Sequence, residues 1–477
     1  MRTRKKLKIK QMSNLKTKEL SKLGYTNDKA RSLVITIVAK HFKYHSKSEL
    51  ITLLTNIKNK PEDYVNDEIV GKIAETFIDK TEVCNFKTHE LLQEIGHLKI
   101  YGGKEIDHSA KKQMSIAMSL PVCVQGALMP DAHTGYGLPI GGVLATDNAV
   151  IPYAVGVDIG CRMALSIFDE NDKYINRHGF HLKEALRNYT HFGMDGGLEF
   201  KQEHEVLDNA MFKETEFLKR LHAKAVRQIG TSGGGNHFVE FGEIELFENN
   251  SLDVPAGKYL ALLSHSGSRG LGANIAQHYT QIAMDTCKLP REAQSLAWLD
   301  LNTEAGQEYW LSMNLAGDYA KACHDRIHAN LSKALGLKSI ATVENHHNFA
   351  WKETNANGKE LIVHRKGATP AHKGEMGIIP GSMTTAAYLV KGKGIDAALN
   401  SASHGAGRAM SRQKAKENMT NSAMKKMLSD AGVTLIGGSI EENPLAYKDI
   451  ETVINAQKEL IEIEGKFLPK IVRMNKD

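Results

Sequence analysis

Ser403-His404-Gly405-Ala406-Gly407-Arg408 is the last of seven short segments in which this chain of 477 residues gathers side chains that bind metals and phosphates. The other six, in chain order, are Met129-Pro130-Asp131-Ala132-His133-Thr134-Gly135-Tyr136-Gly137, Val157-Asp158-Ile159-Gly160-Cys161, Gly233-Gly234-Gly235-Asn236-His237-Phe238, Ser264-His265-Ser266-Gly267-Ser268-Arg269, His346-His347-Asn348 and Pro380-Gly381-Ser382-Met383. One cysteine, one aspartate and three histidines in these turns supply soft and hard ligands together. The combination predicts a thiolate-bridged pair of metal ions beside a nucleotide.

The candidate metal ligands are Asp158 and Cys161 together with three histidines. Spaced three residues apart across Ile159-Gly160, the carboxylate and the thiol can turn to one side of a tight loop, and a thiolate can bridge two metals. A lone histidine favours a structural role. Three of them next to glycine, serine or asparagine, beside Asp158 and Cys161, favour metal binding instead; they are His237, His265 and His347.

The candidate phosphate-binding turns are Gly405-Ala406-Gly407 and Pro380 to Met383. The chain has neither a Gly-x-x-x-x-Gly-Lys-Ser/Thr loop nor a Lys-x-Asp-Gly motif, so backbone N–H groups in glycine-rich turns are expected to hold the phosphates. His404 lies in the first turn, where a helix is predicted to begin. A neutral imidazole there can attack the α-phosphorus of a nucleotide and expel pyrophosphate.

The seven segments, in this order, resemble those of the RtcB-type RNA ligase family, from about residue 90 to the C-terminus. Members of that family join RNA ends that carry a 3′-phosphate or 2′,3′-cyclic phosphate to a 5′-hydroxyl, using GTP and manganese. The resemblance therefore implies a GTP- and Mn²⁺-dependent RNA ligase (3′-phosphate/5′-hydroxy nucleic acid ligase) of RNA splicing, including tRNA splicing, or of RNA repair.

The same resemblance assigns roles to individual residues. It implies one manganese ion held by Asp158, Cys161 and His237, and a second held by Cys161, His265 and His347. It makes His404 the residue that becomes guanylylated. The implied GTP contacts are Asn236, His237, Phe238, Val239, Glu240, His347, Asn348, Pro380, Gly381, Ser382, Met383, Gly405, Ala406, Gly407, Tyr447 and Lys476.

Individual residues refine the predicted contacts with the nucleotide. Glu240 can accept from both N1–H and the exocyclic amine of guanine, and Tyr447 can stack on the base. Ala387 stands where family members often have a serine, so one hydrogen bond to the nucleotide is lost or replaced. Lys476 is matched to a family lysine although the chain does not end in the usual way. Asp131 and His133 are expected to shape the cleft.

The expected fold class is α+β, with one large RtcB-like catalytic domain at residues 91–477 and a basic, helical N-terminal extension at residues 1–90. Strands are predicted at 122–128, 139–151, 238–241, 259–263 and 361–364, and helices at 107–120, 273–287 and 306–335. The first of these helices is expected to be capped at Asp107-His108-Ser109. A helical insertion is expected near residues 290–335, and a further helix is expected to start at or just after His404 and to run through Lys414.

Composition is that of an ordinary globular protein, with 42% hydrophobic and 24% charged residues. The net charge of +6 is unevenly spread: residues 1–50 carry a surplus of 11 positive charges and the rest a net −5. Such an arm can neutralise phosphates or remain a solvated tail. Five separated cysteines, no secretory signal and no run of eighteen apolar residues predict a cytoplasmic protein with no membrane contact.

The main alternative is a dinuclear metal phosphoesterase that acts on RNA ends without a covalent nucleotide. His404 within a phosphate-binding turn favours the ligase, because a hydrolase needs no such nucleophile. A binding protein with a decayed site is disfavoured because every proposed ligand is present. The sequence leaves open the natural RNA (tRNA, rRNA or mRNA), the need for an accessory activating protein, the role of the extension and the oligomeric state.

Overall fold

The computed structural model describes residues 17–26, 28–42, 45–77, 86–194 and 197–476. The chain divides into two compact units between residues 85 and 86, and each is described by itself. Mixed helices and sheets confirm the α+β prediction. The assignment of an extension that ends near residue 90 and a catalytic domain that follows it stays a proposal, and residues 1–16 of the basic arm lie outside the described residues.

The described residues of the first unit form the α-helices α1 (Thr17–Lys22), α2 (Asp28–His41), α3 (Lys47–Asn59) and α4 (Gly71–Ala74) around their own apolar core. Helix α3 begins with a capping box, in which Ser46 accepts from the N–H of Glu49 and Glu49 accepts from the N–H of Ser46. Its Leu50, Leu54 and Ile57 are buried, as helical spacing requires.

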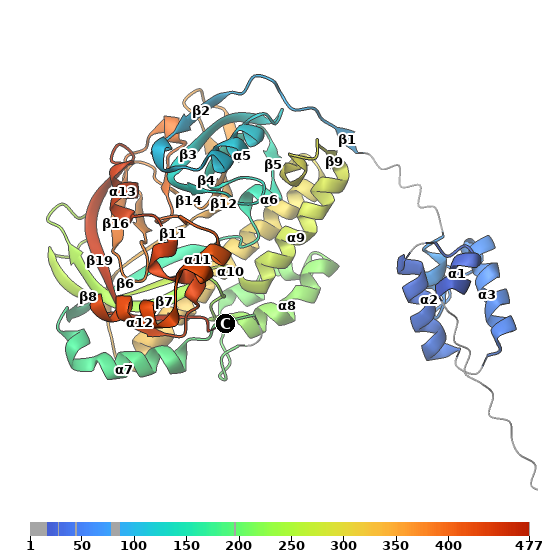
Figure 1. Cartoon of the computed structure of the whole chain (residues 1–477), viewed down its shortest axis with the longest axis horizontal. Coiled ribbons are helices and arrows are strands. Elements are labelled where there is room, and N and C mark those ends of the chain that lie inside the picture. Colours follow the sequence, from blue (N-terminus) through green and yellow to red (C-terminus); the bar gives the residue numbers. More distant parts are fainter. Residues whose placement is uncertain (1–16, 27, 43–44, 78–85, 195–196, 477) are drawn as a thin grey trace, which may run out of the picture. The chain divides into compact units, whose positions relative to one another are not determined.

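The larger unit is built on two sheets (Figure 1). The eight-stranded sheet follows the path β11 (Ser339–His346), β6 (Arg162–Asn171), β8 (Gly257–Ser266), β7 (Phe238–Leu246), β19 (Ile461–Met474), β16 (Ala387–Gly392) and β15 (Met376–Ile379), and β18 (Thr434–Ile436) pairs with β19. The two ends of this path approach each other, because the Asn345 side chain on β11 accepts from Ile378 N–H on β15 at 2.9 Å. The sheet is therefore strongly curved.

The five-stranded sheet has the order β12 (Asn348–Thr354), β13 (Glu360–Lys366), β4 (Ile140–Thr146), β3 (Cys123–His133) and β2 (His97–Ile100). Three strand pairs complete the unit: β14 (Ala368–Pro370) with β17 (Ser401–Ser403), β1 (Lys87–Thr88) with β9 (Cys287–Lys288), and β5 (Ala149–Val150) with β10 (Leu299–Asp300). Each of the five predicted stretches contains a strand, but 139–151 is divided into β4 and β5, which belong to different sheets, and β3 extends through Asp131 to His133.

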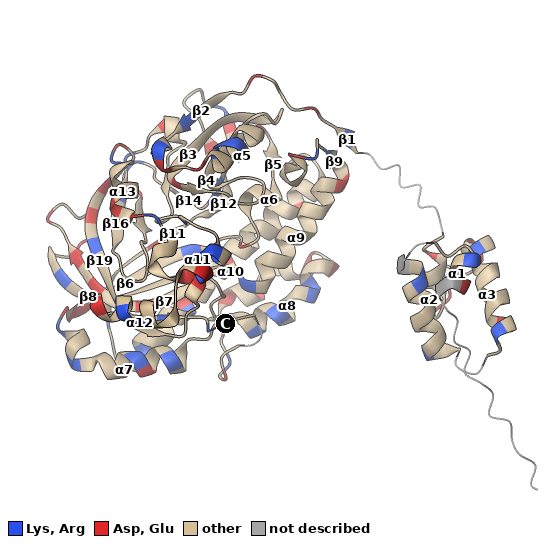
Figure 2. Ribbon diagram, in the orientation of Figure 1, with Lys and Arg blue, Asp and Glu red and all other residues tan. Residues whose placement is uncertain are grey.

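The helices of the larger unit are α5 (His108–Met118), α6 (Pro152–Val155), α7 (Tyr174–Tyr189), α8 (Glu216–Gln228), α9 (Arg269–Thr286), α10 (Glu304–Leu335), α11 (Arg412–Asn418), α12 (Asn421–Asp430) and α13 (Ile450–Asn455). Helices α7 and α10 pack on β7 and β8 through one apolar cluster. Figure 2 shows charges of both signs along α7. Within the described residues, no helix combines the length and apolar composition needed to cross a membrane.

Three expectations about helices need correction. Residues 290–335 are no insertion, because the single long helix α10 contributes buried side chains to two core clusters. Asp107 precedes α5 but its side chain makes no capping hydrogen bond. No helix starts at His404: this residue follows β17, and α11 begins only at Arg412 with Ser411 as its N-cap. The helix expectation failed because glycine at 405 and 407 favours a turn.

Four adjacent strands bring the candidate ligands together. In the order β11, β6, β8 and β7, neighbours are antiparallel, so the end of β11, the start of β6, the end of β8 and the start of β7 share one edge of the sheet. His265 lies opposite Met163 and Phe238, and Ser266 opposite Arg162. Residues that flank these strand ends are therefore adjacent in space although they are far apart in sequence.

Candidate metal and nucleotide site

A cavity of about 1000 Å³ opens at this edge of the sheet. The sequence-predicted residues that line it are Asp158, Cys161, Asn236, His237, Phe238, Glu240, His265, His347, Asn348, Pro380, Gly381, Ser382, Met383, His404, Gly405, Ala406, Gly407 and Tyr447. Two predicted contacts are not among the lining residues: Val239 is buried in the core, and Lys476 is exposed near the C-terminus.

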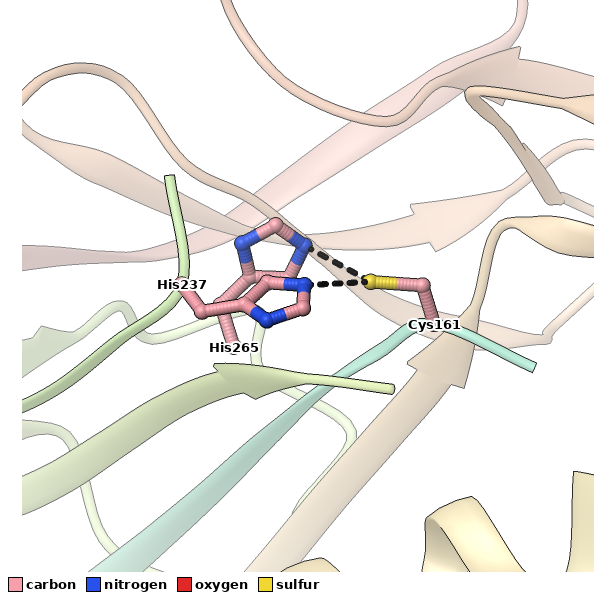
Figure 3. A group of neighbouring side chains, drawn as sticks. All are labelled: Cys161, His237 and His265. Carbon is pink, nitrogen blue, oxygen red and sulfur yellow. Dashed lines mark hydrogen bonds between the residues drawn. The ribbon is translucent and has the colours of Figure 1, made fainter. Parts of the chain in front are cut away.

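The thiol of Cys161 is the centre of the candidate metal site. Its Sγ lies 3.4 Å from Nε2 of His237 and 3.2 Å from Nε2 of His265 (Figure 3). These three residues form a group of potential ligand atoms that all lie within 4.8 Å of one another. Asp158 reaches the same group from the loop before β6, with Oδ2 2.9 Å from Nε2 of His237. Nε2 of His347 lies 3.2 Å from Nε2 of His265.

Burial keeps the imidazoles of His265 and His347 neutral. It lowers the pKa of His265 to about 3 and brings the pKa of His347 well below its ordinary value. His265 Nδ1–H donates to the carbonyl of Asn236 at 3.1 Å, which leaves the lone pair on Nε2 toward the thiol. Nδ1 of His237 and of His347 has no hydrogen-bond partner among the described residues. Neutral imidazoles with converging lone pairs are suited to a cation.

The acidic ligands behave differently from each other. Burial alone would raise the pKa of Asp158, but His237 holds this pKa below its ordinary value. Burial and the neighbouring Asp158 raise the pKa of the Cys161 thiol well above its usual range. A coordinating cation reverses that effect and binds the thiolate. The donor set of one sulfur, one carboxylate and imidazole nitrogens therefore fits a divalent transition metal such as manganese or zinc.

Two glycines leave room for these ligands. A Cβ atom on Gly267 would lie 2.0 Å from Oδ1 of Asp158, so a side chain there would displace the carboxylate. Gly160 has φ of +70°, and a Cβ atom on it would lie 2.9 Å from Cα of Gly317 on α10. The glycines in the quoted segments therefore allow the loop before β6 to pack against α10 and the start of α9.

A buried chain of hydrogen bonds ties α10 to the strand that carries His265. Ser166 on β6 bonds Nδ1 of His328 at 2.7 Å, and Nε2 of His328 bonds Ser264 at 2.7 Å. Ser264 also bonds Nδ1 of His324 at 2.6 Å, and Nε2 of His324 lies 3.2 Å from the carbonyl of Ser266.

When the imidazoles of His324 and His328 are both neutral, the donor and the acceptor of every bond in this series of hydrogen bonds can be assigned in only one way. A carbonyl only accepts, so Nε2–H of His324 donates to Ser266, and Nδ1 of His324 accepts from the Ser264 hydroxyl. Ser264 then accepts from His328, whose Nδ1 accepts from Ser166. Burial lowers the pKa of His328 to about 4 and brings that of His324 well below the ordinary value, which keeps both neutral.

His404 lines the same cavity as the candidate metal ligands and is held by Asp131. Nδ1 of His404 donates to Oδ2 of Asp131 at 2.7 Å, and the same oxygen accepts from the His404 backbone N–H at 3.1 Å. The carboxyl group of Asp131 is fully buried, and the His404 ring lies 5.0 Å from that of His347. The sequence predicted only a cleft-shaping role for Asp131. Its direct bond to His404 joins residues 273 positions apart.

The glycine-rich turn after His404 packs directly against β3. Gly407 has φ of +73°, and a Cβ atom on it would lie 2.0 Å from the carbonyl of Asp131. Ala406 N–H donates to the carbonyl of Pro380 at 2.9 Å, so the two predicted phosphate-binding turns are neighbours. Ser382 bonds Thr385, and Ala387 also lines the cavity. The two turns thus form one wall.

Cations line the cavity too, and the sequence did not single them out. Lys366 is buried, its ammonium group bonds the carbonyls of Tyr136 and Tyr153, and burial lowers its pKa to about 8. Arg408 pairs with Glu442 at 2.8 Å and lies over the Tyr447 ring at 5.4 Å. A lone lysine at the end of a strand gives no sequence signal. Arg408 entered the prediction only as the last residue of the segment that begins at Ser403.

The curved, mainly antiparallel sheet carries a cavity with sulfur, carboxylate and imidazole donors, which is the class of site found in metal-dependent enzymes. The protein family described as tRNA-splicing ligase RtcB matches residues 113–218 and 181–474. The chain is 31% identical to the RNA-splicing ligase RtcB of Escherichia coli K12 over 76% of this chain and 93% of that protein. It is 30% identical to the tRNA-splicing ligase RtcB of Nanoarchaeum equitans over 79% of this chain and 94% of that protein. The chain belongs to the RtcB family.

The position of Cys161 between two histidines leads to the first prediction. Cys161→Ser should weaken Mn²⁺ binding at every site that calorimetric titration resolves, because serine is a poor ligand at neutral pH. His265→Ala should weaken mainly one site. Cys287→Ser is the control, because Cys287 is also buried but does not line the cavity. An equal partial loss of metal for Cys161→Ser and His265→Ala would contradict a bridging thiolate.

The buried series of hydrogen bonds from Ser166 through His328, Ser264 and His324 leads to the second prediction. Ser264→Ala leaves Nδ1 of His324 and Nε2 of His328 without partners, so the free energy of unfolding should fall by about 1–3 kcal/mol. Urea denaturation of the metal-free protein measures this. Ser166→Ala removes one bond at the outer end of the chain and should cost less. Equal losses for the two variants would show that Ser264 is not the central link.

Proposed function

We propose that the protein is a GTP- and Mn²⁺-dependent RNA ligase. It joins an RNA end with a 3′-phosphate, or with a 2′,3′-cyclic phosphate opened beforehand, to a 5′-hydroxyl end, in RNA splicing or repair. The observation that carries the proposal is the hydrogen bond between Nδ1 of His404 and Asp131 inside a cavity lined by metal ligands. Relatives named as RNA-splicing ligases support the choice of RNA as substrate.

The bond to Asp131 determines which nitrogen of His404 can react. A carboxylate only accepts, so Nδ1 carries the proton and Nε2 has the lone pair. Within the described residues Nε2 of His404 makes no hydrogen bond. It is therefore available to attack the α-phosphorus of GTP. An N–P bond forms, the bond to the β-phosphate oxygen breaks, and pyrophosphate leaves.

Two transfers complete the reaction. An oxygen of the RNA 3′-phosphate attacks the phosphorus on His404, the N–P bond breaks, and the RNA end then carries GMP. The 5′-hydroxyl oxygen next attacks the RNA phosphorus, a phosphodiester forms, and GMP leaves while the hydroxyl loses its proton. Asp131 stabilises the imidazole of His404 in one orientation through each step.

The proposed metal ligands are Asp158, Cys161 and His237 for one ion and Cys161, His265 and His347 for the other. Bound manganese would stabilise negative charge on the reacting phosphates. The residues themselves keep the ligand nitrogens deprotonated and shield this end of the cavity from bulk water, since His265, His347 and Cys161 are all buried. This ligand assignment is part of the proposal.

Guanine is proposed to bind at the start of β7, where Phe238 and Glu240 line the cavity and Asn236 and His237 precede the strand. Further contacts are proposed from Val239, Tyr447 and Lys476, and phosphate contacts from the turns at Pro380 to Met383 and at Gly405 to Gly407. We also propose that the protein acts in the cytoplasm. Whether it needs an activating partner is left to experiment.

The test of the proposal is labelling with α-labelled GTP and Mn²⁺, followed by denaturing electrophoresis. The protein should become labelled, and His404→Ala should abolish the label. Asp131→Ala should slow labelling about 100-fold or more, because nothing then holds the proton on Nδ1 and the lone pair on Nε2. Asp147→Asn, at an exposed turn, is the control for charge. An unlabelled protein that releases phosphate from RNA ends would instead be a phosphoesterase.

The fourth prediction concerns Glu240, whose pKa burial raises to about 8. Guanine donates from N1–H and its amine to a carboxylate, so binding must release the proton that Glu240 holds at neutral pH. Affinity for guanosine should therefore rise about tenfold per pH unit from pH 6 and level off above pH 8. Calorimetry in two buffers measures the proton release. Glu240→Gln should abolish this pH dependence, whereas Glu245→Gln on the same strand should keep it.

A further inference from the structure

Tyr136 is a large aromatic residue that the proposed reaction does not use. It lies in the hairpin between β3 and β4, lines the rim of the cavity and is 77% exposed. Within the described residues its ring makes no hydrogen bond, aromatic pair or cation contact. A single exposed aromatic residue is ordinary on a protein surface. What sets Tyr136 apart is the fixed backbone beneath it and its neighbours in the cavity.

The backbone of this hairpin is fixed on both sides of Tyr136. Gln113 on α5 accepts from Gly135 N–H at 3.0 Å and donates to its carbonyl at 2.6 Å. The ammonium group of Lys366 donates to the carbonyl of Tyr136 itself. Gly137 has φ of +69°, and a Cβ atom on it would lie 3.2 Å from Ser295. The loop is rigid where it presents the ring, so little entropy would be lost when a ligand binds.

The same contacts connect Tyr136 to the reacting residues. Lys366, which bonds its carbonyl, is followed by Gly367, whose N–H donates to the carbonyl of His347 at 2.8 Å. A Cβ atom on Gly367 would lie 3.1 Å from Cε1 of His404. The Tyr136 backbone is therefore connected through Lys366 and Gly367 to the proposed metal ligand His347 and the proposed nucleophile His404. Tyr136 thus lines the same cavity as His404 and the proposed metal ligands.

The residues proposed to hold guanine come from another part of the fold. Phe238 and Glu240 lie on β7 of the eight-stranded sheet, whereas Tyr136 belongs to the β3–β4 hairpin of the five-stranded sheet. Tyr136 is thus more suited to a base of the RNA than to the base of GTP. An exposed ring that lines the same cavity as cations such as Lys366 and Arg412 is the combination that binds single-stranded nucleic acid.

We propose that Tyr136 is a stacking platform for the base of an RNA nucleotide next to the ends that are joined. This inference rests on the proposed function. The flat ring would hold the strand through its π-face, which every base shares, so it would orient RNA ends without selecting their sequence. Tyr136 is a positioning residue: it holds the strand while His404 and the metal ligands act on the phosphate.

The experiment compares Tyr136→Ala with Tyr136→Phe, using short RNAs with a 3′-phosphate or a 5′-hydroxyl. Tyr136→Ala should raise the KM for RNA and weaken RNA binding by anisotropy about fivefold to a hundredfold, with a smaller change in kcat. Tyr136→Phe keeps the ring and should stay near the unchanged protein. Guanylylation of His404 by GTP should be unchanged in both variants.

Matched RNAs that lack one base identify the nucleotide. An abasic site in the terminal or next position of either strand should weaken binding to the unchanged protein as much as Tyr136→Ala weakens binding of intact RNA. The same abasic RNA should then lose nothing further with Tyr136→Ala. A normal KM for Tyr136→Ala, an equal loss for Tyr136→Phe, or additive losses with every abasic RNA would overturn the stacking role.

Two other outcomes separate this inference from the function on which it rests. A raised KM for GTP in Tyr136→Ala, with unchanged RNA binding, would place the guanine of GTP on the ring and overturn the assignment to RNA. If the unchanged protein is neither guanylylated nor able to join RNA, the proposed function fails. In that case anisotropy with intact and abasic RNA still decides whether a base stacks on Tyr136.

Discussion

The meeting of four antiparallel strand ends at one edge of the eight-stranded sheet is the constraint on which the site depends. Cys161 precedes β6, His237 precedes β7, His265 lies near the end of β8 and His347 follows β11. The ladder hydrogen bonds between these strands fix the register, and a shift by one residue would turn His265 to the opposite face. The relative positions of these four side chains are thus set mainly by the pairing of the strands, and the adjoining loops add the remaining residues of the site.

Burial then decides the protonation of the residues that the sheet brings together. Desolvation favours neutral imidazoles, which is the state that binds a metal, and it also favours the neutral thiol, which is not. The neighbouring Asp158 opposes thiolate formation further. A cation resolves this conflict, because it can be shared by the sulfur, the carboxylate and the imidazoles. The site is therefore electrostatically incomplete without one, and metal binding should be coupled to loss of the thiol proton.

The sequence predicted the residue types well and their contacts poorly. Glycine, serine and asparagine around histidines indicated which histidines line the cavity, and period-3.6 patterns found α9 and α10, because both signals are local. The bond between Asp131 and His404 depends on the packing of β3 against β17, which no local pattern carries. The position of Lys366 could not be predicted from the sequence, because its hydrogen-bond partners are backbone carbonyls and every residue has one, whatever its side chain. The prediction of a helix at His404 was wrong because Gly405 and Gly407 favour a turn there, although the residues that follow have a helical pattern.

The proposed metal ligands flank strands of the eight-stranded sheet, whereas the proposed nucleophile His404 follows β17 and packs against Gly367, just after β13 of the five-stranded sheet. Their separation therefore depends on the segment that joins these two sheets. That segment is His347-Asn348: β11 of one sheet ends just before it, and β12 of the other begins at Asn348. His347 N–H donates to the carbonyl of Cys161 at 3.0 Å, and Gly160 N–H donates to that of Asn348 at 2.7 Å. The Asn348 side chain also accepts from Gly367 N–H at 2.8 Å. Because these bonds hold the loop of Cys161 and the strand next to His404 at the same two residues, the sheets cannot slide without moving a metal ligand. Asn348 therefore links the loop that carries Cys161 to the turn at Gly367 that packs against His404.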